Sequence, residues 1–206
     1  MKNTIICIGR EYGSGGREIG EKLAERLHIP CYDKLLLKLG AEQFGINESR
    51  MQEMDEMPPV SLFSGNAFAD TAMMMQTFYS ESEQTTNAVR ETMKKLAAEQ
   101  SCIIIGRCAS AFLKDYPVVS VFIYADKEDC IHRIMNRNQL SYRDAEKRFK
   151  QVNKMRKRYF DFYSDTKWGE AESYDAMLSS SALGIEGCVD LIEKSVRLKQ
   201  EVWGHE

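Results

Sequence analysis

The residues best suited to chemistry lie in a glycine-rich stretch at positions 9–20. Gly13, Gly15 and Gly16 permit positive φ and let backbone N–H groups close around an anion without obstruction by a Cβ atom. An apolar run precedes the stretch and a helical pattern follows it, so its end coincides with a helix N-terminus, where free N–H groups and the helix dipole favour a phosphate. The stretch therefore predicts a phosphate-binding loop; the alternative is a plain glycine-rich turn from strand to helix.

This loop departs from the common G-x-x-x-x-G-K-S/T pattern, in which the Lys contacts the β- and γ-phosphates and the hydroxyl contacts Mg²⁺. In one alignment Gly16 and Arg17 stand at the Lys and Ser/Thr positions, and in an alignment shifted by one residue Arg17 and Glu18 do. In either case Arg17, alone or with Arg10, is expected to supply the cation. Ser14 is the only hydroxyl among the loop glycines.

Three charged residues lie close to the ends of other strand-like runs. Asp33, Arg107 and Asp126 are placed at the carboxyl ends of these runs, where open parallel sheets bind their ligands. Asp33 has a second interpretation as the N-cap of the helix expected over 34–44, and the residue taken alone favours the cap slightly.

A basic segment is found at 141–163. Residues 133–158 hold ten Lys and Arg against two acidic residues, which leaves 18 basic and 29 acidic residues in the rest of the chain. Arg156 falls on the apolar stripe of this segment, so it needs an anionic partner, unless its stem lies along apolar surface with its head in water. Lys154, Lys157 and Arg158 project elsewhere. The segment is either a solvated helix or a lid that closes positive charge over phosphates.

The bulk composition limits the possible functions. With 206 residues, 43% of them hydrophobic, the chain is long enough for one well-buried domain. A net charge of −3 and a pI near 5.8 give no general attraction to nucleic acid or to anionic membranes. No apolar run approaches the roughly 20 residues of a membrane span, and no cleavage pattern of a secretory signal is present. A cytoplasmic protein without nucleic-acid or membrane partners is expected.

Cysteine and histidine do not predict a metal site. The six cysteines are scattered without a C-x-x-C pair, so we expect reduced, mostly buried thiols. The three histidines match no ligand spacing.

Alternating strands and helices must position the charged residues. Strands are expected at 4–8, 31–32, 102–105, 118–124 and 174–179. Helical patterns are clearest at 17–27, 34–44, 86–99, 141–163 and 184–198. Residues 45–70 contain two consecutive prolines and are expected to form a connection. The alternation predicts an α/β protein with a parallel, doubly wound sheet.

A set of short motifs along nearly the whole chain resembles the cytidylate kinase-like family. They are the loop at 10–17, Tyr32-Asp33-Lys34, Ile105-Gly106-Arg107, the helical segment 153–159, Trp168-Gly169, Tyr174-Asp175 and Ser179-Ser180. The resemblance implies one domain over residues 1–206 with a three-layer P-loop kinase fold and a parallel five-stranded sheet. It further implies a monophosphate-binding insertion at 45–85 and a basic helical lid at 133–163.

The activity implied by this resemblance is ATP- and Mg²⁺-dependent phosphoryl transfer to a nucleoside monophosphate, with CMP or dCMP as the expected acceptor. The ATP-binding residues would be Arg10, Gly13, Ser14, Gly15, Gly16, Arg17, Arg133 and Arg137. The residues facing the monophosphate would be Asp33, Arg107 and Arg158, and the catalytic residues Arg17, Arg107 and Arg156. Such a set suits phosphoryl transfer, which depends mainly on positioning and on cations that neutralise charge on the transferred group.

Several positions depart from the pattern of true cytidylate kinases. The loop Lys is absent, Ile105 and Cys108 stand where a strand-end motif resembling Asp-Gly-Arg-Asp has its acids, and Asn153 stands where the lid more often has Asp. The Mg²⁺ ligands are therefore unassigned, with Glu11, Asp33 and Asp126 as candidates. These departures leave two alternatives: a kinase for another small acceptor, or a nucleotide-binding protein that has lost transfer. The sequence assigns no oligomeric state.

Overall fold

The structure is a computed structural model that describes residues 3–57 and 69–203, without the side chains of residues 69–75 and 203. Its five strands form one parallel sheet in the order β2-β3-β1-β4-β5. The strands are β1 (Ile5–Arg10), β2 (Cys31–Tyr32), β3 (Cys102–Ile105), β4 (Val118–Tyr124) and β5 (Ala176–Ser179). The parallel, doubly wound sheet predicted from the sequence is confirmed.

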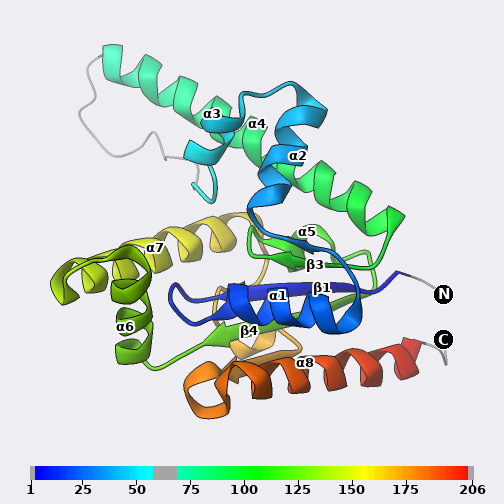
Figure 1. Cartoon of the computed structure of the whole chain (residues 1–206). Coiled ribbons are helices and arrows are strands. Elements are labelled where there is room, and N and C mark those ends of the chain that lie inside the picture. The colour runs from blue at the N-terminus through cyan, green and yellow to red at the C-terminus, as the bar shows by residue number, and fades with distance from the viewer. Residues whose placement is uncertain (1–2, 58–68, 204–206) are drawn as a thin grey trace.

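Helices cover both faces of the sheet (Figure 1). They are α1 (Gly16–Leu27), α2 (Lys34–Phe44), α3 (Glu48–Glu53), α4 (Ala69–Glu99), α5 (Ala109–Phe112), α6 (Lys127–Asn138), α7 (Tyr142–Tyr163) and α8 (Ser180–Trp203). Among these helices, in the part of the chain that is described, none is long and apolar enough to cross a bilayer.

Alternation along the strands builds two cores, one on each face. In β1, Ile6 and Ile8 point to the face covered by α1 and α8, whereas Ile5 and Cys7 point to the face covered by α2, α4, α5 and the end of α7. Successive side chains of a strand alternate between faces, so a strand that is apolar throughout must be covered on both sides. The result is a helix–sheet–helix sandwich in which the carboxyl ends of the strands meet at one edge.

All six cysteines are free thiols, and five of them are buried, as expected from the sequence. Burial raises the pKa of Cys102, Cys108 and Cys130 to about 12. These thiols therefore pack as small apolar groups.

The segment between α2 and β3 differs from the sequence prediction. Residues 48–53, expected to lie in a connection, form α3, because the Asn47 side chain caps the helix by accepting from the Arg50 N–H and Met51 is buried beneath it. The helix predicted from residue 86 is only the end of α4, which begins at Ala69. Ser82 and Thr85 are buried on α4, and such hydroxyl residues interrupt the apolar periodicity that the prediction used.

The last strand and helix also differ in their bounds. β5 begins at Ala176 rather than 174, because the Asp175 carboxylate accepts from the Ser120 N–H at 2.7 Å, where a strand carbonyl would otherwise pair. α8 begins at Ser180 rather than 184, and Gly184, with φ 69° and ψ 173°, interrupts the helix. The predicted helix corresponds to the regular part after that interruption.

α6 and α7 form a helical arm beside the loop between β1 and α1 (Figure 1). Ile131, Ile134 and Ala145 join the two helices in a small core, against which Tyr12 of the loop packs. The Ser141 side chain caps α7 by accepting from the Asp144 N–H. α7 thereby passes from the loop toward the carboxyl ends of β1 and β3.

Candidate functional site

The glycine loop connects β1 to α1 in a conformation that excludes other residues. Gly13 and Gly15 have φ of 85° and 83°. A Cβ atom at Gly13 would lie 2.5 Å from the Cys130 carbonyl oxygen, and one at Gly15 would lie 2.6 Å from a methyl group of Ile185. Gly15 is the N-cap of α1, and no side chain caps this end of the helix. The first N–H groups of α1 are therefore available to an anion.

The helical arm supports the outer side of this loop. Arg133 donates to the Gly13 carbonyl and to Ser180 Oγ, each at 3.2 Å. Asn153 Oδ1 accepts from the Tyr12 N–H at 2.8 Å, and the Arg137 guanidinium lies 5.1 Å from the centre of the Tyr12 ring. Arg133 and Arg137, predicted to contact ATP, thus hold the loop backbone and the Tyr12 ring.

Two polar side chains of the loop are turned inward. Ser14 is buried, and its hydroxyl donates to the Glu11 carbonyl at 2.9 Å. The Glu11 carboxylate accepts from the Ala125 N–H at 3.4 Å, and burial raises its pKa. The Ser14 hydroxyl therefore stabilises the loop itself.

Arg17 is the most accessible cation of the loop region, with 53% of its side chain exposed. Its Nε lies 2.8 Å from Glu21 Oε1 and 3.7 Å from Asp33 Oδ2. The side chain thus lies between the start of α1 and the end of β2, where it can reach a phosphate bound at the loop.

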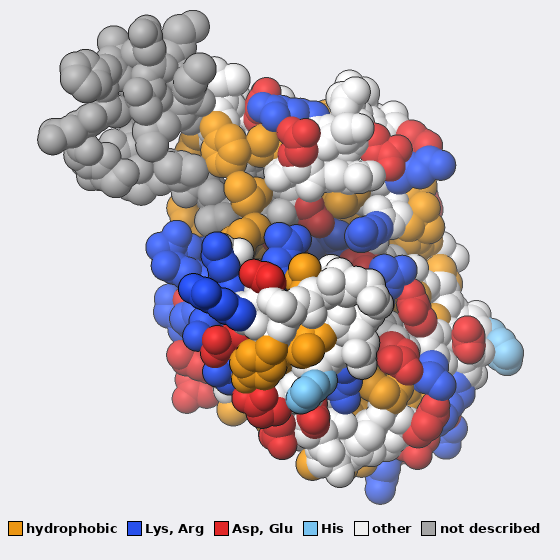
Figure 2. Space-filling view, turned by 60° about the vertical axis from the view of Figure 1, so that its left-hand side comes forward, with side chains coloured by type: hydrophobic (Ala, Val, Ile, Leu, Met, Phe, Trp, Pro, Cys, Tyr) orange, Lys and Arg blue, Asp and Glu red, His pale blue; other side chains and the backbone are white. Residues whose placement is uncertain are grey.

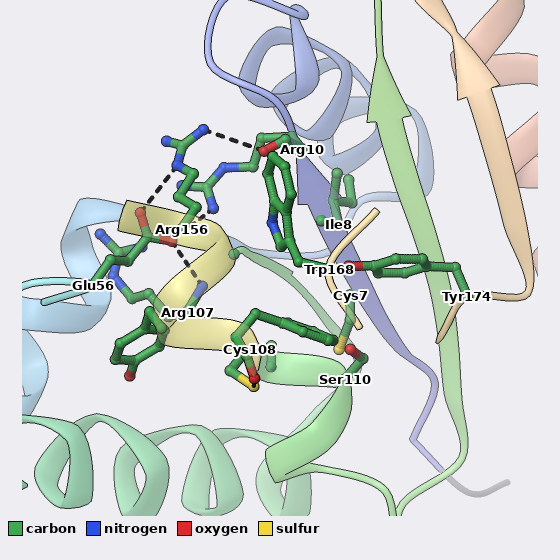
Figure 3. Close-up of a pocket in the computed structure, with 15 residues that line it drawn as sticks. Cys7, Ile8, Arg10, Glu56, Arg107, Cys108, Ser110, Arg156, Trp168 and Tyr174 are labelled. Carbon is green, nitrogen blue, oxygen red and sulfur yellow. Dashed lines mark hydrogen bonds and ion pairs between the residues drawn. The ribbon is translucent and has the colours of Figure 1, made fainter. Parts of the chain in front are cut away.

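A cluster of three arginines and three carboxylates fills the carboxyl ends of β1, β2 and β3; Figure 3 shows its three arginines and Glu56. We call it the arginine–carboxylate cluster; it consists of Arg10, Asp33, Asp55, Glu56, Arg107 and Arg156. Figure 2 shows Lys and Arg side chains gathered where helices α2, α3 and α4, at the top of Figure 1, meet the part of the molecule that contains the sheet.

Arg107 is the most deeply buried member, with 3% of its side chain exposed. It binds Asp55 in a bidentate manner, with Nε–Oδ1 and Nη2–Oδ2 distances of 2.8 Å, and its Nη1 donates to Asp33 at 3.0 Å. Burial alone would lower the pKa of Arg107, but Asp55, Glu56 and Asp33 outweigh it and raise the pKa.

Asp33 therefore does not act as a helix cap. It occupies the N-cap position of α2, but its side chain makes no capping hydrogen bond and is directed to Arg107. Burial opposes ionisation of this carboxyl, yet Arg107 and Arg10 hold its pKa below the usual value. The cap interpretation was wrong because a buried guanidinium attracts a carboxylate more strongly than a helix N–H does.

Glu56 is held by three donors from separate elements. Its Oε1 accepts from Arg10 Nη1 at 2.9 Å and from the Arg107 backbone N–H at 3.1 Å, and its Oε2 accepts from Arg156 Nε at 3.2 Å. Burial alone would raise the pKa of Glu56, but Arg10 and Arg156 hold it well below its usual range. Burial, and then the neighbouring Arg10, lower the pKa of Arg156 to about 10.

Arg10 reaches this cluster by passing over Gly106. A Cβ atom at Gly106 would lie 1.5 Å from Arg10 Nη1, so a larger residue there would push the guanidinium out of the cluster. Arg156 in turn donates from Nη1 to the Arg10 carbonyl at 3.3 Å, at the entrance to the glycine loop. Arg158, by contrast, is exposed on α7, and its side chain makes no hydrogen bond or ion pair with the described part of the chain.

An aromatic wall lies beside the cluster. One pocket is lined by Arg10, Glu56, Arg107 and Arg156 on one side and by Phe160, Trp168 and Tyr174 on another (Figure 3). Guanidinium groups suit an anion, whereas the rings of Phe160 and Tyr174 are buried in the core beside them.

The residues near the loop fit Mg²⁺ in chemical type. Over residues 3–57 and 69–203 no group of three or more His, Cys, Asp or Glu could hold a metal ion. Mg²⁺, however, takes only one or two carboxylates alongside substrate phosphates. Glu11 lies in the loop itself, Asp33 lies 3.7 Å from Arg17, and Asp126 is exposed at the start of α6. Glu11 and Asp33 are the carboxylates that could hold it.

Asp55 and Glu56 are the members of the site that the sequence analysis missed. They form an acidic pair directly before Met57 and the two prolines. The residues of this segment indicate a connection, and the family resemblance places it in the insertion without assigning a role to either acid. The one signal was the requirement for an anionic partner of Arg156. That partner lies 100 residues away in the chain, so its identity depends on the tertiary fold.

Comparisons with known proteins show what the whole chain is similar to. The model of the cytidylate kinase-like family matches residues 5–182. A cytidylate kinase of Methanococcus aeolicus is 29% identical over 149 residues, which are 67% of this chain and 83% of that protein. An uncharacterised protein of Eubacterium ventriosum has a similar structure, with a TM-score of 0.70, 29% identity, and coverage of 95% of this chain and 99% of that one.

More distant structures share the fold alone. A gluconokinase from Sinorhizobium meliloti gives a TM-score of 0.55 at 12% identity, covering 100% of this chain and 98% of that one. A shikimate kinase from Bacteroides thetaiotaomicron gives a TM-score of 0.51 at 14% identity, covering 98% of each chain. The fold is the three-layer fold of P-loop kinases.

Proposed function

The chain belongs to the cytidylate kinase-like family, and from this premise we propose that it transfers a phosphoryl group from ATP to a nucleoside monophosphate, with CMP or dCMP as the acceptor. The carrying observation is that an uncapped helix N-terminus behind a glycine loop lies next to a buried group of three arginines. The similarity to a protein named cytidylate kinase supports the choice of acceptor.

The donor would bind at the glycine loop. Backbone N–H groups from Gly13 to Arg17 would surround the ATP phosphates, and the Arg17 guanidinium would supply the charge that a Lys supplies in the common pattern. Arg133 and Arg137 would not contact ATP and would instead position the loop, through the Gly13 carbonyl and the Tyr12 ring. Mg²⁺, when bound through Glu11 or Asp33, would neutralise charge on the phosphate oxygens.

The acceptor would bind at the arginine–carboxylate cluster. Arg107 and Asp33, at the ends of β3 and β2, would position the monophosphate. Arg156 contacts both the Arg10 carbonyl and the cluster, so its guanidinium would lie between donor and acceptor and stabilise charge on the transferred phosphoryl. The exposed Arg158 lies outside this arrangement.

The insertion and the lid would complete the site over the carboxyl ends of the strands. We assign the monophosphate-binding insertion to 45–85, of which residues 58–68 lie outside the described part, and the lid to 133–163. One contact between their described residues is the ion pair of Glu56 with Arg156. A site built from two such parts can exclude water during transfer.

The test is ADP release from ATP and Mg²⁺ with CMP, dCMP, UMP, AMP, GMP or no acceptor. Arg17→Ala is the test variant. Arg26→Ala is its matched control, because Arg26 lies on the same helix but pairs with Glu186 and Asp190 of α8. We expect turnover that depends on CMP or dCMP, is lost in Arg17→Ala, and is retained in Arg26→Ala.

Other outcomes would identify the alternatives. Turnover with a different small acceptor would keep the kinase and change its substrate. ATP binding without ADP release on any acceptor would indicate a nucleotide-binding protein, which the absence of the loop Lys makes the main competitor. Unchanged kinetics in Arg17→Ala would remove Arg17 from the phosphate site.

A further inference from the structure

Resting on the proposed function, we infer that Glu56 is an internal anion in the acceptor-phosphate subsite, and that a phosphate monoester binds by displacing its carboxylate from Arg10, Arg107 and Arg156. The subsite would thus be closed by the chain itself until a phosphate of higher charge competes for the same donors.

The surroundings of Glu56 are those of a bound anionic ligand. Two guanidinium groups and one backbone N–H converge on a single carboxylate, at 2.9, 3.2 and 3.1 Å. Charge-assisted donors and main-chain N–H groups of this kind also bind phosphate oxygens. Only 13% of the Glu56 side chain is exposed, so the carboxylate lies inside the site.

The distribution of charge explains why Glu56, and not its neighbours, would be displaced. Asp33 and Asp55 both pair with Arg107, so this guanidinium stays neutralised without Glu56. Within the described residues, Glu56 is the only carboxylate that pairs with Arg10 or Arg156. One carboxylate therefore serves two cations, whereas a phosphate monoester carries about −1.5 to −2 at neutral pH. A phosphate would match these two guanidiniums more closely.

The position of Glu56 in the chain permits this exchange. Its three donors belong to β1, to the turn after β3 and to α7, whereas Glu56 itself follows α3 in the insertion. Glu56 has φ 54°, a backbone conformation that residues with a side chain rarely adopt. The bidentate pair of Asp55 with Arg107 holds this segment independently. Glu56 can therefore leave while its donors and Asp55 remain in place.

Calorimetric titration with inorganic phosphate tests the exchange directly. Glu56→Gln removes the competing charge and keeps the side-chain shape. Glu53→Gln is the matched control, because Glu53 is exposed on α3 and pairs with Arg50 outside the cluster. We expect Glu56→Gln to bind phosphate at least tenfold more tightly than the native protein, and Glu53→Gln to bind as the native protein does. Equal or weaker binding by a folded Glu56→Gln would make Glu56 a permanent structural partner and overturn the inference.

A second measurement uses the native protein and does not depend on the variant folding. Hydrogen exchange of the amides at 53–57 is followed with and without saturating phosphate. Displacement predicts faster exchange at Glu56 and Met57 with phosphate, whereas the amides before Asp55, which the pair with Arg107 holds, serve as the reference. Unchanged or slower exchange at Glu56 and Met57 would contradict it. Neither measurement uses ATP or turnover. The displacement of Glu56 can therefore be confirmed in a protein that has no kinase activity, and it can be disproved in a protein that is an active kinase.

Discussion

Arg156 shows how far a single residue can be interpreted before the fold is known. Its place on the apolar stripe of α7 predicted either an anionic partner or a stem along apolar surface with its head in water, and the structure supplies the partner, Glu56, at 3.2 Å. The requirement could be predicted because helical periodicity is local. The partner could not, because it comes from a segment in which turn residues and prolines indicate a connection, and the resemblance that marks it as an insertion does not say which of its acids meets Arg156.

The role of Arg156 can be separated from its packing by substitution. Arg156→Lys keeps a charge but loses the planar group that contacts Glu56 and the Arg10 carbonyl together, and Arg156→Ala loses the charge as well. We expect kcat with the best acceptor to fall about 10²–10³-fold in Arg156→Ala, as when a transition-state donor is removed, and by less in Arg156→Lys. Steady-state kinetics and thermal unfolding of both variants provide the measurement.

The contrary result would be a folded Arg156→Ala protein with normal kcat and a lower melting temperature. Arg156 would then serve only to hold α7 against the insertion. Arg158→Ala is the matched control, since Arg158 is exposed on the same helix and lies outside the cluster. Its kcat should match that of the native protein.

At the scale of elements, the glycine loop was predictable because its glycines have local causes. Positive φ at Gly13 and Gly15 follows from a strand that must turn at once into a helix, whereas the close approach of Cys130 in the arm is a tertiary contact. The boundaries of α3 and α4 were less predictable. In α3 a single residue, Met51, is buried under a short capped helix. In α4 some of the buried residues carry hydroxyl groups. Neither helix therefore shows a clear apolar periodicity in the sequence.

Substitution of Gly13 tests whether the loop geometry is fixed by the arm. Gly13→Ala places a methyl group 2.5 Å from the Cys130 carbonyl oxygen at positive φ, so both strain and a clash result. Gly45→Ala has a similar φ of 66° with no atom within 4 Å, so only strain remains. We expect losses of unfolding free energy of about 2–4 kcal/mol for Gly13→Ala and about 1 kcal/mol for Gly45→Ala.

Chemical denaturation measures both losses, and ATP binding adds an independent readout. Gly13→Ala should also weaken ATP affinity, whereas Gly45→Ala, at the end of α2, should leave it unchanged. Equal losses of stability in the two variants would mean that the loop can move away from α6 without cost.

At the scale of the whole molecule, the sheet was easier to predict than the site it carries. Strands that are apolar on both faces specify a covered parallel sheet, and the carboxyl ends of its strands mark the edge where ligands bind. Asp33 and Arg107 were placed at that edge from sequence. The remaining contacts join residues from separated parts of the chain, such as Arg10 with Glu56, and no local pattern specifies which of them meet.

The arginine–carboxylate cluster should also make the stability of the whole molecule depend on acidity. The pKa of Glu56 is held low by Arg10 and Arg156 despite its burial. Its contribution to stability is therefore complete above its unfolded pKa of about 4.5 and is lost as the pH falls through the lower folded value. The pKa of Asp55 is instead raised by burial, so protonation of Asp55 favours the folded state and partly offsets this loss.

A comparison of the native protein with Glu56→Gln isolates the contribution of Glu56 from that of Asp55. Urea unfolding at several pH values between 7 and 3 should show the native protein losing more free energy of unfolding than Glu56→Gln below about pH 4.5. The difference in slope is at most about 1.4 kcal/mol per pH unit, because only one proton is involved. Parallel curves for the two proteins would mean that Glu56 is not ion-paired in the folded chain. That result would exclude the Glu56–Arg156 ion pair between the insertion and the lid. It would also exclude Glu56 as the anion that a phosphate displaces. Each proposal requires a charged Glu56 bound between Arg10 and Arg156.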